Sequence, residues 1–206
     1  MEKYSESYLN QKISDIFERK YVFLTGNATT AIYIALRALN IRKGNVILPN
    51  TLCPDPANAV LYNCLKPTFC DVNLEDYNIN IDNLNKTITK DTRAIIPVHL
   101  FGQPSEIDII NEIAEDRDLP IIEDVAQAAG GKYKGKKLGT FGDVSVLSFG
   151  GKIINAKEGG AVLTDDAKIA HNIEKEIKKL APRLENKERI YHIYRRIFYA
   201  TRDACQ

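Results

Sequence analysis

The sequence predicts an α/β fold, in which helices cover both faces of a mostly parallel sheet of about seven strands in three α/β/α layers. Short apolar runs alternate along the chain with amphipathic stretches that are long enough to form helices. Most of the apolar runs are too short and too uniformly apolar to have one solvated face, which is typical of strands buried between two layers of helices. We therefore expect a helix-covered sheet with one main core.

The expected elements follow from periodicity and from the turn residues that bound each run. In chain order, the expected strands cover residues 22–24, 46–49, 68–71, 94–99, 121–124, 144–149 and 161–164. The expected helices cover residues 9–19, 29–39, 57–65, 106–117 and 167–180.

The composition is that of a globular protein without a dominant charge. The 206 residues are 44% hydrophobic and 27% charged, which is enough for one sizeable core. A net charge of +1 argues against nucleic acid as a partner. No apolar run approaches the ~20 residues that span a bilayer, and the first residues lack a signal-peptide core, so we expect a cytoplasmic protein. The four cysteines lack CxxC spacing, so neither a metal site nor a disulfide framework is expected.

We expect residues 1–180 to form one domain, because no repeat or flexible linker divides them. Residues 181–206 are predicted to be a basic amphipathic helical tail, the start of a missing or truncated carboxyl-terminal region. Its apolar side chains could lie on a membrane surface, but packing against its own domain or missing sequence is the favoured interpretation. The side chains spaced for one helical face are Ile190, Ile193, Tyr194, Ile197 and Phe198.

The segment between the first expected strand and the next helix could hold a phosphate. Small residues at Gly26 and Ala28 let the backbone approach an anion, and the amides and dipole of a helix start favour a dianion. The Thr29 hydroxyl is a further donor. An ordinary helix cap by Asn27, Thr29 or Thr30 explains the same residues, and taken alone it is the favoured interpretation. A dinucleotide-binding Rossmann protein ranks last, because no GxGxxG fingerprint is present.

An acid at the end of one core strand and a lysine after the next suggest a site that needs a carboxylate and an amine. Asp124 closes the strand at 121–124, and Lys152 follows the glycine pair after the strand at 144–149. Pyridoxal phosphate chemistry requires this pair: the lysine forms the Schiff base, and the carboxylate keeps the pyridine nitrogen protonated. Singly, Asp124 could be a helix cap and Lys152 a solvated loop lysine, but their joint placement favours the site.

Together these segments resemble the sugar aminotransferase (DegT/StrS) family of fold-type I pyridoxal phosphate enzymes. The resemblance runs from about residue 17 to residue 164. It includes the segments 27–31, 98–104, 123–128 and 139–143, and the glycine pair at 159–160. It implies an aspartate aminotransferase-like large domain with pyridoxal 5′-phosphate as its cofactor. It also implies a homodimer that transfers an amino group from an amino acid, with glutamate as the expected donor, to a keto group of a nucleotide-linked sugar.

The resemblance also implies roles for individual residues. Lys152 and Asp124 would be catalytic, Asp124 pairing with the pyridine nitrogen and Gln127 with the phenolic oxygen. Such a transferase would serve the biosynthesis of cell-surface polysaccharides or of secondary-metabolite sugars. The implied cofactor-binding residues are Ala28, Thr29, Asp124, Gln127, Ser148 and Lys152.

Three departures from the family pattern support an alternative, a truncated and non-catalytic remnant that acts at most in binding or oligomerisation. The loop before Lys152 is one residue shorter than usual, which makes Lys157 a second choice for the lysine. Cys53 stands where many relatives place an aromatic residue, and we expect it to be a small buried residue. The family's small carboxyl-terminal domain is also missing. A dehydratase variant of the family has histidine in place of the lysine, and Lys152 argues against it.

Overall fold

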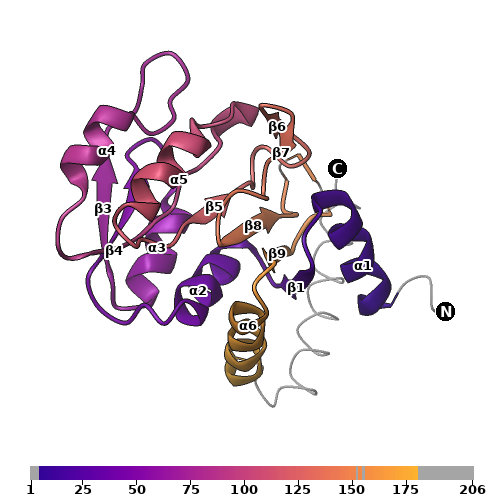
Figure 1. Cartoon of the computed structure of the whole chain (residues 1–206). Helices are drawn as coiled ribbons and strands as arrows, with labels where there is room; N and C mark the ends of the chain where they lie inside the picture. Colours follow the sequence, from indigo (N-terminus) through magenta and orange to yellow (C-terminus); the bar gives the residue numbers. More distant parts are fainter. Residues whose placement is uncertain (1–4, 152, 155, 181–206) are drawn as a thin grey trace, which may run out of the picture.

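The computed structural model describes residues 5–151, 153–154 and 156–180 (Figure 1). Lys152 and the tail predicted at 181–206 lie outside the described residues, so the two-part division of the chain stays a prediction.

The order of helices and strands follows the predicted one. The helices are α1 (Glu6–Phe17), α2 (Ala28–Ala38), α3 (Pro54–Tyr62), α4 (Ile81–Thr87), α5 (Ile107–Glu115) and α6 (Ala167–Leu180), with a 3₁₀ turn η2 (Leu100–Gly102). The strands are β1 (Tyr21–Thr25), β2 (Asn45–Pro49), β3 (Lys66–Cys70), β4 (Thr92–Ile95), β5 (Ile122–Asp124), β6 (Lys132–Tyr133), β7 (Lys136–Lys137), β8 (Val144–Ser148) and β9 (Gly160–Thr164). Every predicted element is present, the helix at 167–180 with the predicted ends and the others with shifted ends, whereas α4, η2 and the β6–β7 hairpin lie outside the predicted elements.

The sheet is mixed, which corrects the expectation of one mostly parallel sheet. One sheet has the order β1-β9-β8-β5 and the other has the order β3-β2-β4. The pairs within β3-β2-β4 and the pair β5–β8 are parallel, but β9 is antiparallel to both β1 and β8. The antiparallel turn has a physical reason: the described residues between β8 and β9 contain no helix, and a parallel return needs a long crossover.

Isolated parallel bridges connect the two sheets at the edge where β4 meets β5. They pair Ile95 with Ile121 and Val98 with Asp124. The strand expected at 94–99 is thus shorter than predicted, because regular pairing ends at Ile95. The α/β class is confirmed.

Alternating side chains of the strands enter cores on opposite faces. On β2, Val46 and Leu48 pack with residues of α2, α3 and α6, whereas Ile47 packs with residues of α4 and α5. A third cluster joins Ile13 and Phe17 of α1 to side chains of β1, β8 and β9. Helices therefore cover both faces of the strands (Figure 1).

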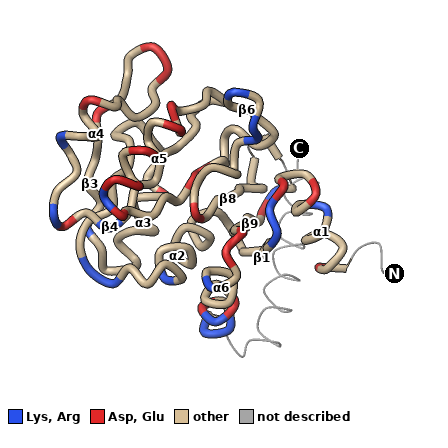
Figure 2. Tube along the Cα trace, in the orientation of Figure 1, with Lys and Arg blue, Asp and Glu red and all other residues tan. Residues whose placement is uncertain are grey.

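Charged residues are scattered over many elements and are not gathered on one (Figure 2). This distribution agrees with the net charge of +1. Within the described ranges, no helix combines the length and the hydropathy that a membrane crossing would need.

Candidate active site

A cavity of about 400 Å³ lies where the carboxyl ends of β5 and β8 meet the start of α2. Five of the residues predicted to bind the cofactor line it: Ala28, Thr29, Asp124, Gln127 and Ser148. Lys152 lies outside the described residues, but Gly150 and Lys157, on either side of it in the sequence, also line the cavity. Residues from widely separated parts of the sequence thus converge on one space.

The start of α2 presents backbone donors to this cavity. Asn27 is the N-cap, and its Oδ1 accepts a hydrogen bond from the Thr30 amide at 2.8 Å. The ordinary cap that the sequence suggested is therefore present. The amides of Ala28 and Thr29 lie in the first turn, where no helical acceptor exists for them. Both residues line the cavity, so the cap and an anion-binding helix start can occur together.

Gly160 allows β9 to pass close to this helix start. A Cβ at Gly160 would lie 2.7 Å from the carbonyl carbon of Asn27 and 2.8 Å from the amide nitrogen of Ala28. Next to it, the Gly159 amide donates to the carbonyl oxygen of Gly26 at 3.1 Å. A glycine is thus required where β9 supports the start of α2.

Asp124 is the last residue of β5, and it is held at the cavity by backbone contacts on both sides. Its amide donates to the Pro97 carbonyl at 2.9 Å, and its carbonyl accepts from the His99 amide at 3.2 Å. The side chain Oδ1 accepts from the Ala126 amide at 2.9 Å. Only 4% of Asp124 is exposed, so little of this residue at the cavity is in contact with solvent.

Gln127 and Ser148 complete the polar lining. The Gln127 Oε1 accepts from the Phe101 amide at 3.2 Å, an amide orientation that assigns Nε2 as the remaining donor. Phe101 adopts a φ of 52°, in the left-handed region that non-glycine residues rarely use. Ser148 ends β8 and is 8% exposed, and its Oγ accepts from the Gly150 amide at 3.5 Å.

Cys53 is exposed and lines the cavity, which corrects the expectation of a small buried residue. It precedes Pro54, the first residue of α3. A residue before proline is held extended, and here it lies outside the helix at the cavity rim.

Comparison with known proteins places the chain in a family. The model of the DegT/DnrJ/EryC1/StrS aminotransferase family matches residues 4–201. The chain belongs to this family. Its relatives include a GDP-perosamine synthase of Escherichia coli O157:H7, which is 42% identical over 149 residues, or 71% of this chain and 41% of that protein.

Solved structures of the family share the fold. The aminotransferase from Psychrobacter cryohalolentis superimposes with a TM-score of 0.79 at 32% identity, over 82% of this chain and 43% of that one. NtdA from Bacillus subtilis, solved with bound cofactor PMP, gives a TM-score of 0.76 at 32% identity, over 81% and 38% of the two chains. The family depends on pyridoxal phosphate. The chain spans about two fifths of the length of the curated relatives it matches.

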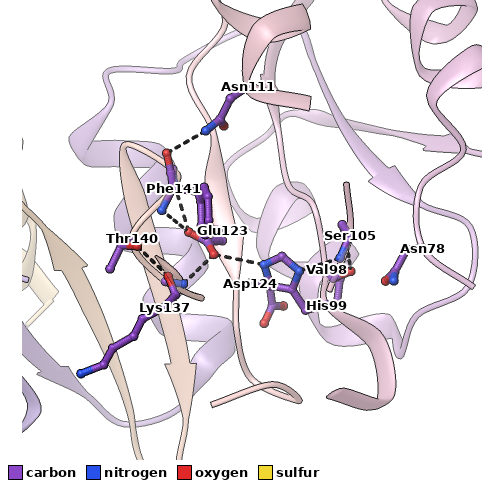
Figure 3. Close-up of polar contacts among 12 residues, drawn as sticks. Asn78, Val98, His99, Ser105, Asn111, Glu123, Asp124, Lys137, Thr140 and Phe141 are labelled. Atoms are coloured by element: carbon purple, nitrogen blue, oxygen red, sulfur yellow. Dashed lines mark hydrogen bonds and ion pairs between the residues drawn. The ribbon is translucent and has the colours of Figure 1, made fainter. Parts of the chain in front are cut away.

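Behind the cavity, the neighbouring carboxylate Glu123 forms a buried network that the sequence analysis did not assign (Figure 3). Its side chain is fully buried and accepts four hydrogen bonds. The donors are His99 Nε2 at 3.1 Å and the amides of Gly139 at 2.5 Å, Phe141 at 2.9 Å and Gly142 at 3.1 Å. Burial alone would raise the pKa of this carboxyl, but the His99 hydrogen bond and the amides outweigh it, so the pKa lies below its ordinary value.

His99 is fully buried and uses both ring nitrogens. The Ser105 amide donates to Nδ1 at 3.0 Å, so the proton of the neutral ring lies on Nε2, which donates to Glu123. The Ser105 hydroxyl in turn donates to the Val98 carbonyl at 3.0 Å.

Arg19 binds the same turn, residues 139–142, from its carbonyl side. Its Nε donates to the Gly139 carbonyl at 2.6 Å, and its Nη2 donates to the Gly142 carbonyl at 2.5 Å. Its Nη1 forms an ion pair with Asp165 at 2.9 Å. We call Glu123, His99, Arg19 and the turn 139–142 the buried clamp. In the sequence, one sign of the clamp was Glu123, a glutamate at the end of an otherwise apolar run. Nothing in the residues around Arg19 indicated its part in the clamp.

Proposed function

We propose that this chain binds pyridoxal 5′-phosphate in the cavity and forms the large domain of an aminotransferase. The amino group would pass from an amino acid, with glutamate as the expected donor, to a keto group of a nucleotide-linked sugar. The observation that carries the proposal is the convergence of the α2 start, Asp124 and Ser148 on one cavity. Family membership and the similarity to a GDP-perosamine synthase support the substrate class.

One group of lining residues fits a phosphate. The first-turn amides of Ala28 and Thr29 and the positive end of the α2 dipole favour a dianion. The hydroxyls of Thr29 and Ser148 add neutral donors. Gly160 keeps the backbone cradle open, because any Cβ there would displace the start of α2. The cavity volume also lies within the range of small-molecule and cofactor sites.

A second group of lining residues fits the ring. Asp124 is nearly buried, where a carboxylate interacts strongly with a cationic ring nitrogen. Gln127 keeps Nε2 as a donor for the phenolic oxygen, because its Oε1 is engaged by the Phe101 amide. When bound, the cofactor supplies an electron sink for the amino-acid chemistry.

Lys152 is the proposed covalent anchor and proton carrier. Its Nζ would hold the cofactor and then move a proton between the reacting carbons. Lys157 lines the cavity and remains the second choice. The proposal also includes a homodimer, a cytoplasmic location and a role in polysaccharide or secondary-metabolite sugar biosynthesis.

A second candidate is a non-catalytic member of the family. The observation that favours it is Cys53, which lines the cavity at the position where the family resemblance implies an aromatic residue. Such a protein would keep the cofactor cavity or the fold without turnover.

Absorbance spectroscopy with added pyridoxal phosphate tests the proposal. We expect a visible band that borohydride removes, with the label mapped by mass spectrometry to Lys152. The variant Lys152→Ala should lose the label, and Lys157→Ala serves as the matched control that keeps it. No band in the wild type, or label spread over surface lysines, would refute the cofactor site.

A turnover assay then separates the two candidates. Unreduced wild type loaded with pyridoxal phosphate is mixed with glutamate and a GDP-linked keto-sugar, and 2-oxoglutarate is measured. Formation of 2-oxoglutarate that depends on the sugar supports the transferase. A protein that binds the cofactor on Lys152 but releases no 2-oxoglutarate with this or other amino donors and keto-sugars supports the non-catalytic member.

A further inference from the structure

The strand β5 presents Asp124 to the cavity, and its own backbone hydrogen bonds fix its register only weakly. β5 has three residues, and it pairs with β8 over Ile122–Val144, Glu123–Ser145 and Asp124–Val146. On its other side it has isolated bridges to the β4 segment. Because side chains alternate along a strand, a shift of one residue would exchange the two sides on which Glu123 and Asp124 lie.

Such a shift matters here because both residues are carboxylates. In the structure Asp124 lines the cavity, whereas Glu123 has no surface exposure and belongs to the buried clamp. A shift of one residue that brings Glu123 to the cavity would place Ile122, which has no acceptor in its side chain, against the turn 139–142. The four donors that surround Glu123 would then be left too far from an acceptor, which is costly for buried groups.

His99 contacts β5 at both of these positions. Its ring Nε2 donates to the Glu123 carboxylate at 3.1 Å, and its backbone amide donates to the Asp124 carbonyl at 3.2 Å. The ring is itself held by the Ser105 amide at Nδ1. One buried residue thus connects the side chain of the clamp to the backbone of the residue at the cavity (Figure 3).

We propose that His99 and Glu123 are positioning residues that fix the register of β5, so that Asp124 and not Glu123 faces the cavity. Neither residue lines the cavity. This inference rests on the proposed function for its catalytic meaning, because Asp124 is the group expected to pair with the cofactor ring. The register itself can be measured without any cofactor.

Three variants of the full chain separate positioning from general stability. His99→Phe fills the buried site but removes both ring hydrogen bonds. His99→Gln keeps a side-chain donor for Glu123. Leu84→Ala is the matched control, since Leu84 is fully buried in the cluster around α4 and its side chain takes part in none of the hydrogen bonds of the clamp.

Hydrogen exchange without cofactor is the first measurement. The amides of Asp124 and Val125 report the register directly, because their acceptors are the carbonyls of Pro97 and Val146 on the neighbouring segments. We expect exchange across 121–128 to be about tenfold faster in His99→Phe, to be restored in His99→Gln, and to be unchanged in Leu84→Ala at matched stability. Equal exchange in His99→Phe and Leu84→Ala would overturn the positioning role.

Cofactor binding is the second measurement, read as the dissociation constant and the position of the absorbance band. We expect pyridoxal phosphate to bind about tenfold more weakly to His99→Phe with a shifted band, while Leu84→Ala keeps both. If the wild type binds no cofactor but exchange responds as expected, the register role stands and the proposed function fails. If the wild type binds cofactor and His99→Phe matches the control in exchange, only the positioning role fails.

Discussion

The two sides of β5 carry neighbouring carboxylates in contrasting surroundings. Glu123 accepts four hydrogen bonds from protein groups and is fully buried. Asp124 faces a cavity that also receives the first-turn amides of α2, which have no helical acceptor. The contrast teaches that a carboxylate with all its partners inside the protein, such as Glu123, holds the fold together. A carboxylate at a cavity that also receives backbone donors, such as Asp124, is arranged for a ligand.

Removal of each carboxylate gives the sharpest test of this contrast. Glu123→Ala leaves three amides and the His99 ring without their buried acceptor, and we expect a loss of about 3–5 kcal/mol in the free energy of unfolding. Asp124→Asn keeps an acceptor for the Ala126 amide and should change stability by less than about 1 kcal/mol. Urea denaturation measures both. Equal losses would mean that the cavity side is as structural as the clamp.

Lowering the pH tests the clamp through protonation of the Glu123 carboxylate. The pKa of Glu123 in the folded chain lies below its ordinary value, so the unfolded chain binds a proton more readily. The stabilisation from the ionised Glu123 is therefore fully present at pH values above the ordinary pKa of a glutamate. It is lost as the pH falls through the lower pKa of Glu123 in the folded chain. Burial alone would raise the pKa of Asp165, but hydrogen bonds from the Lys20 amide and from Arg19 hold it below its ordinary value as well. Urea unfolding at several acidic pH values should show a steeper decline in wild type than in Glu123→Gln, and parallel curves would contradict this assignment.

Gly160→Ala tests the cavity side through its backbone. The new Cβ would meet the backbone of Asn27 and Ala28 within 2.8 Å, so the start of α2 must move. We expect a stability loss of about 1–3 kcal/mol together with weaker binding of pyridoxal phosphate. Gly26→Ala is the control for stability, because nothing lies within 4 Å of its added Cβ. Thermal unfolding and a binding titration measure the two effects. If Gly160→Ala kept both the stability and the cofactor affinity of the wild type, β9 would not constrain the start of α2 as proposed.

Substitutions of Asn27 give the smallest expected effect and separate capping from ligand binding. Asn27→Ala removes the acceptor of the Thr30 amide and should cost about 1 kcal/mol. Asn27→Asp keeps that acceptor and should retain the stability, but its negative charge beside the anion site should weaken cofactor binding. If both variants bind the cofactor as the wild type does, the phosphate does not lie at the start of α2.

The sequence could predict the elements and part of the cavity lining, because both depend on local patterns. Apolar runs located the strands, and Ala28, Thr29 and Asp124 lie at an expected helix start or strand end. Gln127 and Ser148 were implied by the family resemblance. Carboxyl ends of parallel strands meet at one edge of a sheet, so such residues come together. The catalytic roles of these residues stay predictions, as does the role of Lys152.

The clamp could not be predicted, because its contacts depend on the tertiary arrangement. Arg19 binds carbonyls of the turn 139–142, more than a hundred residues away in the sequence. The direction of β9 was missed for a different reason. An apolar run gives the position of a strand but not its direction, and the lack of a helical pattern after Ser148 was the available signal.

The pairing of β1 with β9 sets when the cavity can form during synthesis. Tyr21 lies opposite Thr164, and in the described sheet β1 is an edge strand whose neighbour is β9. A nascent chain emerges from its amino end, so β1 has to wait for nearly the whole described domain before it can pair. The loop that follows β1 and lines the cavity is therefore among the first segments of the described domain to be made and among the last to be put in place.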